Sequence, residues 1–346
     1  MPPEQALAQG SWVKLICGAS NQDLAAIEDL AGLYGLVGVH CIDAAADRAV
    51  VAAVRRGLAW AQQQGRGGSP PWLMLSLSDG SDPHFRKAWF DPSRCPADCP
   101  RPCERVCPAL AIGVAATGCA GVLEQRCYGC GRCLPACPQG LIEERSQVLA
   151  ADAVPALLAD LRPDAIELHC QPNRLQAFAD RLAQLAASGV TLRRLAVSMA
   201  ADRRSPDTLA AELWQRYALL RAAEWQPLWQ LDGQPMSGDL GPAPARAAVR
   251  LLERLRTRLP PGPLQLAGGT NAQTLPELQR RQLRGAVAGV AFGGDARRRL
   301  QPWLLEAQQR GRRLLDCPDL WPQALAQAEA LVAPWLGLQG VGVRGC

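Results

Sequence analysis

Residues 11–47 read SWVKLICGASNQDLAAIEDLAGLYGLVGVHCIDAAAD, and this stretch holds one strand-helix unit followed by the strand of the next unit. The runs WVKLICGAS and GVHCIDAAAD are short and apolar, as strands of a buried parallel sheet are. The segment between them has helical spacing and ends near glycine, where helices often stop. A chain that repeats this pattern is expected to form a parallel sheet covered by helices.

The pattern recurs along the 346 residues, with three apolar runs before a cysteine-rich block and five after it. Helical segments such as RLQAFADRLAQLAASG (174–189) separate the runs. Eight such units predict a (βα)8 barrel, and a doubly wound sheet of six or seven strands is the main alternative. The other six runs are PWLMLSLSDG (71–80), DAIELHCQP (164–172), LRRLAVSMA (192–200), PLWQLDGQP (227–235), PLQLAGGTN (263–271) and AGVAFGGDA (288–296).

The domain organisation follows from the position of the cysteine-rich block. Residues 1–90 are predicted to form the first three barrel strands, and 147–346 the other five and a C-terminal helix with Trp321 and Trp335. The block at 91–146 is then an insertion in the loop after the third strand. That loop lies at the face of a barrel where active sites are built.

Nine of the fourteen cysteines lie between Cys95 and Cys137. In the segment CYGCGRCLPACP, two residues separate Cys127 from Cys130 and Cys130 from Cys133, and Cys137 is followed by proline. This is the spacing of a bacterial ferredoxin motif, in which the last cysteine binds the cluster of the other half. The spacing predicts an iron-sulfur site and a second motif upstream.

The second motif is CPADCPRPCERVCP (95–108), in which three residues separate each cysteine from the next and the last cysteine precedes proline. Similar phrases, CPALAI and CPQGLI, follow the two cysteine-proline pairs, as expected for two related halves. Each half is therefore predicted to lend one ligand to the other. Cluster A is assigned to Cys107, Cys127, Cys130 and Cys133, and cluster B to Cys95, Cys99, Cys103 and Cys137.

The longer gaps of the upstream motif change how its loop wraps and can withdraw one ligand, with Cys99 as the first candidate. The prediction is two clusters, of which at least one is 4Fe-4S and the other is 4Fe-4S or 3Fe-4S. Cys119 lies in the hairpin expected between the halves and is left out of both clusters.

Three other interpretations of the cysteines compete. Zinc sites also use CxxC pairs, but the pairs usually stand well apart and do not end in CP. A disulfide framework needs a secreted chain, and the N-terminal MPPEQALAQGSWVK has neither a basic nor an apolar signal segment. Radical enzymes of the S-adenosylmethionine class use one C-x3-C-x2-C triple, whereas the x3 gap occurs repeatedly here.

Polar residues on the apolar runs are predicted to point into the barrel, because the outer face of each strand packs under helices. Lys14 could pair with Glu167 or Asp232, and His169 could act as an acid or base, which makes these four the candidate catalytic residues. The alternative is a polar core whose groups only satisfy one another. The predicted inward set is Lys14, Asp43, Ser76, Ser78, Glu167, His169, Ser198, Gln230 and Asp232.

Two glycine pairs end the last two candidate strands, where barrels often bind phosphate. Gly268 with Gly269, and Gly293 with Gly294, could bind a phosphate-bearing ligand such as a flavin, and tight turns alone are the alternative. His40 and His84 have no cysteine or carboxylate at a recognisable metal spacing. Both are interpreted as structural or exposed.

Composition limits the function classes. The net charge is +5, and arginine is scattered among alanine and leucine, so nucleic-acid binding is not indicated. No apolar run approaches the ~18 residues that span a bilayer. Clusters together with unpaired thiols suit a reducing compartment, and the chain is expected to be soluble and cytoplasmic.

Residues 11–47, the double cysteine-proline motif and RCYGCGRCLPACP are together similar to the LdpA family, the light-dependent-period iron-sulfur proteins of cyanobacterial circadian input. The likeness extends from residue 11 to about residue 300. It implies the same eight cysteine ligands, no catalytic residue, and circadian-clock input and oscillator proteins as partners.

The expected function is redox sensing, in which the clusters exchange electrons with small soluble redox carriers and the barrel signals to partners through its surface. On this interpretation the chain is more a sensor or electron-transfer protein than an enzyme. The alternative is a barrel oxidoreductase whose flavin, or other phosphate-bearing ligand, receives electrons from the clusters. A plain electron carrier ranks last, because it would leave the polar barrel without a purpose.

Overall fold

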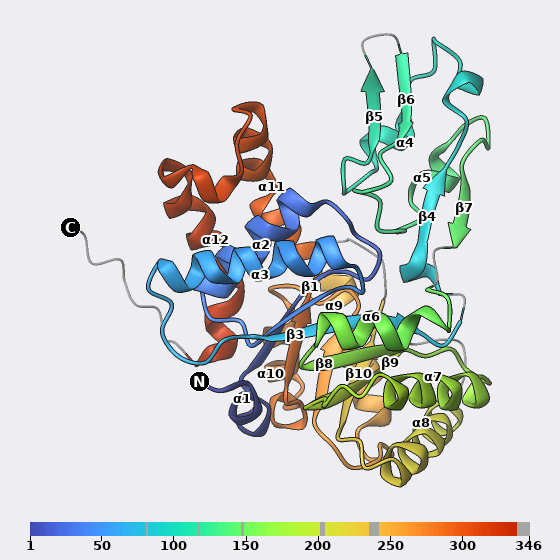
Figure 1. The fold of residues 1–346 in the computed structure, drawn as a ribbon, viewed down its shortest axis with the longest axis vertical. Helices are drawn as coiled ribbons and strands as arrows, with labels where there is room; N and C mark the ends of the chain where they lie inside the picture. Colours follow the sequence, from blue (N-terminus) through green and yellow to red (C-terminus); the bar gives the residue numbers. More distant parts are fainter. Residues whose placement is uncertain (81, 116–117, 147–148, 201–204, 235–241, 338–346) are drawn as a thin grey trace.

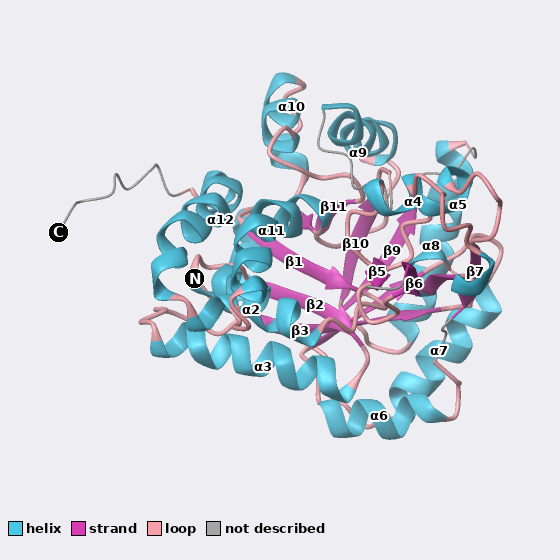
Figure 2. Cartoon of the chain, turned by 90° about the horizontal axis from the view of Figure 1, so that it is seen from above, coloured by secondary structure: helices cyan, strands magenta, loops and turns pink. Residues whose placement is uncertain are grey.

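The computed structural model describes residues 1–80, 82–115, 118–146, 149–200, 205–234 and 242–337. Eight parallel strands close into a barrel in the order β1-β12-β11-β10-β9-β8-β3-β2 (Figure 2). The predicted (βα)8 barrel is therefore confirmed, and the doubly wound sheet is excluded because the first and last strands pair. The barrel strands are β1 (Trp12–Gly18), β2 (Cys41–Ala45), β3 (Trp72–Ser78), β8 (Ala165–His169), β9 (Arg194–Ala200), β10 (Pro227–Asp232), β11 (Leu264–Ala267) and β12 (Gly289–Phe292).

Helices surround the barrel, and most follow the strands in alternation (Figure 1). Acidic and hydroxyl side chains start several of them, as N-caps do. Asp47 Oδ1 accepts the backbone N–H groups of Ala49 and Val50, at 2.8 and 3.0 Å. The helices are α1 (Pro3–Gln9), α2 (Leu24–Leu36), α3 (Arg48–Gln63), α6 (Ala153–Leu161), α7 (Leu175–Ala187), α8 (Pro206–Ala222), α9 (Pro242–Leu255), α10 (Thr274–Arg280), α11 (Gly294–Gln309) and α12 (Trp321–Leu336).

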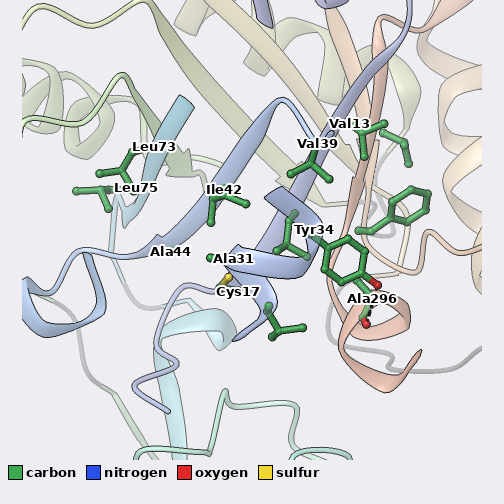
Figure 3. Packing of buried hydrophobic residues seen from close by; sticks show 14 of the residues in the cluster. Val13, Cys17, Ala31, Tyr34, Val39, Ile42, Ala44, Leu73, Leu75 and Ala296 are labelled. Carbon is green, nitrogen blue, oxygen red and sulfur yellow. Dashed lines mark hydrogen bonds between the residues drawn. The ribbon is translucent and has the colours of Figure 1, made fainter. Parts of the chain in front are cut away.

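The apolar core lies between the strands and the helices. Figure 3 shows Val13, Ile42 and Leu75 of neighbouring strands in the same layer as Tyr34 of α2. The Tyr34 hydroxyl donates to the carbonyl of Ala296 at 2.9 Å, which joins α2 to α11. Odd and even positions of each strand thus face opposite sides, as the strand period requires.

A second apolar layer fills the amino-terminal end of the barrel, where α1 packs across the opening. Ala6 and Leu7 of α1 pack against Trp12, Trp72 and the neighbouring strand ends. Above this layer the interior becomes polar, beginning with the indole N–H of Trp12, which donates to Gln265 Oε1 at 2.7 Å. The sequence pattern did not indicate α1, whereas the C-terminal helix predicted around Trp321 and Trp335 is present as α12.

The cysteine-rich segment leaves the barrel after β3 and returns before α6, and Figure 1 shows it projecting beyond one end of the barrel. Its elements are short. β4 pairs with β7 in antiparallel fashion, and β5 pairs with β6. They are β4 (Arg86–Trp89), α4 (Pro102–Arg105), β5 (Ile112–Ala115), β6 (Gly118–Val122), α5 (Cys133–Ala136) and β7 (Glu143–Ser146), with short 3-10 turns at Pro83–Phe85 and Pro92–Arg94. Within the described ranges, no helix has the length and apolar character needed to cross a bilayer.

Candidate functional site

The base of the inserted segment is the β4–β7 pair, where Arg86 lies opposite Ser146 and Trp89 opposite Glu143. The Arg145 guanidinium carbon lies 3.3 Å from the ring centroid of Trp89, so a cation-π contact supports the pair from one face. The β4–β7 pair thus joins the two ends of the inserted segment, and the bounds 91–146 stay a prediction.

Two one-turn helices, α4 and α5, give the insert its two halves. Each ends near a cysteine that precedes proline, and the β5–β6 hairpin connects the halves as the sequence predicted. The insert has a small core of its own, in which aliphatic residues alternate with thiols. Its buried members are Ala88, Phe90, Cys103, Ala111, Ile112, Cys127, Cys133 and Ile142.

One group of thiols gathers from both halves. Burial raises the pKa of the Cys133 thiol to about 12, and the thiols of Cys130, Cys107 and Cys127 raise it as well. The pKa of Cys130 is raised by burial and by the neighbouring Cys107 and Cys127. Cys107 from the upstream motif thus lies with the downstream trio, which is the combination that cluster A requires.

Backbone amides point at the sulfurs of this group. The N–H of Ala88 donates to Cys127 Sγ at 3.3 Å, and the N–H of Ala111 donates to Cys107 Sγ at 3.2 Å. Such hydrogen bonds to ligand sulfurs are among the features that set the potential of an iron-sulfur cluster. Four convergent thiols with amide donors behind them fit a cluster well.

The second predicted group shares the same core. Cys103 is buried, while Cys95 and Cys137 are half-buried and pack against that core. Cys99 is also half-buried and is not among the core residues. The ligand set of cluster B stays a prediction, and the side chain of Cys119 on β6 lies outside the described part of the chain.

The insert is fixed to the barrel mouth by buried hydrogen bonds. The Lys87 ammonium on β4 donates to Gln22 Oε1 and to the carbonyl of Glu124, both at 2.8 Å, and the residue is 2% exposed. The backbone N–H of Gln22 donates to the carbonyl of Gln125 at 2.9 Å. The loop that carries Cys127 and Cys130 is therefore fixed against the loop that follows β1.

A cavity of about 130 Å³ opens at the carboxyl ends of the barrel strands. Tyr128, from the cysteine loop, forms part of its wall together with Cys17 and Arg297. The Arg297 guanidinium donates to the carbonyl of Cys17 at 3.1 Å. Burial and the nearby Cys130 thiol raise the pKa of Tyr128, so this residue lies close to the thiol group and also lines the cavity.

Below the cavity, charged groups meet in the barrel interior. The Lys14 ammonium contacts Asp43 Oδ2 at 3.0 Å and also contacts Glu167 Oε2. Burial acts to lower the pKa of Lys14, but these carboxylates outweigh it and hold the pKa above its ordinary value. The ion pair expected with Glu167 is present, whereas Asp232 is bonded by the hydroxyl of Ser198.

The rest of the network satisfies the remaining polar atoms. Gln230 Nε2 donates to Glu167 Oε1 at 2.6 Å and to Ser198 Oγ at 3.1 Å. Ser76 Oγ donates to Asp43 Oδ1 at 2.8 Å. Burial raises the pKa of Asp43 and Asp232 to about 6, and the charge of Glu167 adds to the effect. Ser78 is buried but bonds locally, to the carbonyl of Gly80 at 2.6 Å.

Both glycine pairs line the cavity, Gly293 and Gly294 at the start of α11. Gly268 and Gly269 have φ values of 63° and 86°, in the left-handed region that favours glycine. A Cβ on Gly269 would stand 2.6 Å from the Cβ of Pro244, so close packing alone requires glycine there. A phosphate site at these turns stays a prediction.

The sequence interpretation missed His84. It lies at the cavity wall, and its Nδ1 is 2.7 Å from Asp82 Oδ1. Asp82 and His84 come four and six residues after the end of β3, at the carboxyl face of the barrel. The signal was the DPH sequence directly after a strand. His40 is structural as interpreted: its ring stacks on Trp12 with centroids 6.0 Å apart.

Together, the fold and the site define a (βα)8-barrel protein with an inserted cysteine domain of the iron-sulfur type. Two family models match the chain: the LdpA Fe-S cluster-binding domain over residues 95–148, and the Light dependent period A C-terminal domain over residues 157–334. Light dependent period A of Synechococcus elongatus is 47% identical over 338 residues, which are 96% of this chain and 93% of that protein. The chain belongs to the Light dependent period A family, and it is an iron-sulfur protein.

Solved structures resemble the chain only in outline. A structure titled as a fructose-1,6-biphosphate aldolase, from Coccidioides immitis, is 14% identical, with 97% of this chain and 95% of that chain covered and a TM-score of 0.47. Tryptophan synthase subunit alpha from Legionella pneumophila is 10% identical, with 95% and 99% covered and a TM-score of 0.39. The strand pairing itself, not these likenesses, establishes the barrel.

Proposed function

We propose that this protein senses redox state in the control of the light-dependent period, through two iron-sulfur clusters held by eight of the nine cysteines of the insert. The observation that carries the proposal is the convergence of Cys107 with Cys127, Cys130 and Cys133 beside the barrel mouth. When bound, an iron-sulfur cluster supplies one-electron exchange at a potential set by its ligands, by hydrogen bonds to sulfur and by exposure. The family name supports the link to the circadian period.

The chain offers a direct route from the thiols to the barrel. Tyr128 follows Cys127 in the chain and lines the cavity, and burial and the charges of Cys130 and Cys107 raise its pKa. Arg297 acts on the same tyrosine and bonds the carbonyl of Cys17 on β1. A change in the charge held by the cysteines thereby reaches β1 and the first turn of α11. This is the path by which the oxidation state would alter the barrel surface that partners meet.

The partners are proposed to be clock-input and oscillator proteins, with small redox carriers as the source of electrons.

The test of redox sensing uses anaerobically purified protein, with iron, sulfide and electron paramagnetic resonance measured first to count the clusters. Amide hydrogen exchange is then compared between the dithionite-reduced and the oxidised protein. The proposal expects oxidation-dependent exchange in the insert, around Tyr128 and in the first turn of α11.

A matched pair of variants separates sensing from simple loss of a thiol. Cys133→Ser removes a buried cysteine of the thiol group, and Cys317→Ser removes a buried cysteine of the barrel core. Only the first is expected to abolish the oxidation-dependent exchange. Identical exchange in the two oxidation states of the wild-type protein would overturn redox sensing while leaving the cofactor in place.

A barrel oxidoreductase is the second candidate, favoured by the cavity between Tyr128 and the two glycine pairs. In that case a flavin or other phosphate-bearing ligand would lie above Glu167 and Asp232, within reach of electrons from the insert. The two functions differ in what the purified protein carries. A flavin absorption band, or a phosphate compound released on denaturation, supports the enzyme, and clusters alone support the sensor.

A further inference from the structure

Three metal-binding side chains meet at the wall of the barrel mouth, away from the cysteines. Asp82 and His84 lie just after β3, and His169 is the last residue of β8, the strand paired with β3. One ligand atom from each of the three lies within 4.8 Å of the other two. The rings of His84 and His169 are tilted by 50° with centroids 4.6 Å apart. They therefore approach without stacking face to face.

Burial and access both suit a metal site. Asp82 and His169 are 4% and 6% exposed, and the side chain of His84 is 21% exposed. Both histidines line the cavity, so the group has one side within the protein and one side open. Sites with three protein ligands and an accessible position are typical of metals that also bind a small molecule.

The surrounding residues orient two of the three side chains. Gln171 Nε2 donates to Asp82 Oδ2, which leaves Oδ1 directed at His84. Glu167 Oε1 lies 3.2 Å from His169 Nε2, a carboxylate against an imidazole as found behind many metal-binding histidines. These contacts fix two of the three side chains from outside the group.

Charge favours a cation here. The buried carboxylates of Asp43, Asp82, Glu167 and Asp232 gather at the upper interior, where Lys14 pairs with Asp43 and Glu167. Buried carboxylates without a matching positive charge are costly. Burial, together with the charge of Glu167, raises the pKa of both Asp43 and Asp232 to about 6. A dication at the histidines would offset the excess.

We propose that Asp82, His84 and His169 bind one divalent first-row transition-metal ion, whose remaining coordination positions face the barrel cavity. Two imidazoles and one carboxylate suit Mn²⁺, Fe²⁺, Co²⁺ or Zn²⁺. The simpler arrangement, a hydrogen-bonded Asp82–His84 pair with no ion, is what the test must exclude.

The test titrates Mn²⁺ into the cluster-containing protein under anaerobic conditions, followed by electron paramagnetic resonance. Mn²⁺ prefers oxygen and nitrogen ligands, so the thiols compete little for it. The expected result is one bound Mn²⁺ per chain with nitrogen couplings from imidazole in the pulsed spectrum. His84→Gln, Asp82→Asn and His169→Gln should each weaken binding at least tenfold.

The third histidine of the chain provides the matched control. His40 lies at the opposite end of the barrel, before β2, and His40→Gln should leave Mn²⁺ binding unchanged. Circular dichroism verifies that each variant is folded, and the half-exposed His84 keeps the test valid if a change at buried His169 unfolds the chain. Lack of Mn²⁺ binding, binding without nitrogen couplings, or equal affinity in His84→Gln and wild type would overturn the proposal.

Discussion

The barrel and the insert solve the same problem, the burial of polar side chains, in different ways. In the barrel, Lys14 is paired with Asp43 and Glu167, and amides and hydroxyls satisfy the remaining atoms. In the insert, three of the eight buried core residues are cysteines, the helices are single turns and the strands have four or five residues. The barrel's buried polar groups are paired with one another, whereas the thiols of the insert are expected to need bound iron-sulfur clusters.

The difference follows from size. An antiparallel pair of short strands has little stability alone, and small domains with thin cores depend on metals or cross-links. None of the twelve cysteines whose side chains the structure describes forms a disulfide. The insert should therefore owe its order to metal binding and to its attachment through Lys87, and the barrel should not.

The largest expected effect is selective unfolding of the insert. Removing iron with a chelator under oxidising conditions should reduce amide protection over residues 86–146 about a thousandfold, because metal binding and folding are coupled in such domains. The barrel strands should keep their protection. Hydrogen exchange with mass spectrometry measures both regions in one sample. Equal protection of the insert before and after iron removal would show that the insert does not depend on metal for its order.

A smaller effect is expected from breaking the polar centre of the barrel. Lys14→Met leaves Asp43 and Glu167 buried without their cation, which typically costs ~3–5 kcal/mol. Urea denaturation followed by tryptophan fluorescence measures the loss. Arg48→Met is the control, because its bridge to Asp160 is exposed and such bridges contribute little. If both variants unfold at the same urea concentration, the buried pair has no special weight.

The smallest expected effect is a pH dependence that belongs to the barrel. The pKa of Asp232 is about 6 in the fold, against an ordinary value near 3.8, mainly because of burial. Between those values the folded state binds the extra proton, so stability falls as pH rises through that window. Asp232→Asn should reduce the loss of unfolding free energy across this pH window by on the order of 1–3 kcal/mol.

Denaturation curves at several pH values between 4 and 7 measure the slope. Asp207→Asn is the matched control, since that carboxylate is 79% exposed. A slope that is unchanged in Asp232→Asn would show that another group titrates in the window.

Much of this architecture could be predicted from the sequence, because it is written in local patterns. Eight apolar runs gave the barrel, and parity along the strands placed Lys14, Glu167 and Gln230 inside. Parity says which side a residue faces but not which partner it meets. Asp232 was a candidate partner of Lys14, yet it is Asp43 on the adjacent strand that reaches the ammonium.

Other features depend on distances that no local pattern encodes. His84 was interpreted as structural or exposed because its partner His169 ends a different strand, although Asp82 is only two residues away in the chain. The helix α1 has only seven residues, too few for a repeated pattern, and it packs across the amino-terminal opening against Trp12. The assignment of Cys107 to the downstream trio was predicted from the repeat of two halves, because in such repeats the cysteine spacing indicates which parts of the chain meet.

The two lysines of this chain have an unexpected practical consequence. Lys14 is fully buried and Lys87 is 2% exposed, and the sequence has no others. Amine-reactive cross-linkers and labels therefore reach neither lysine side chain on the folded protein. A search for binding partners that relies on these lysines would miss them even in an intact complex, whereas reagents directed at carboxylates or arginines would find exposed groups.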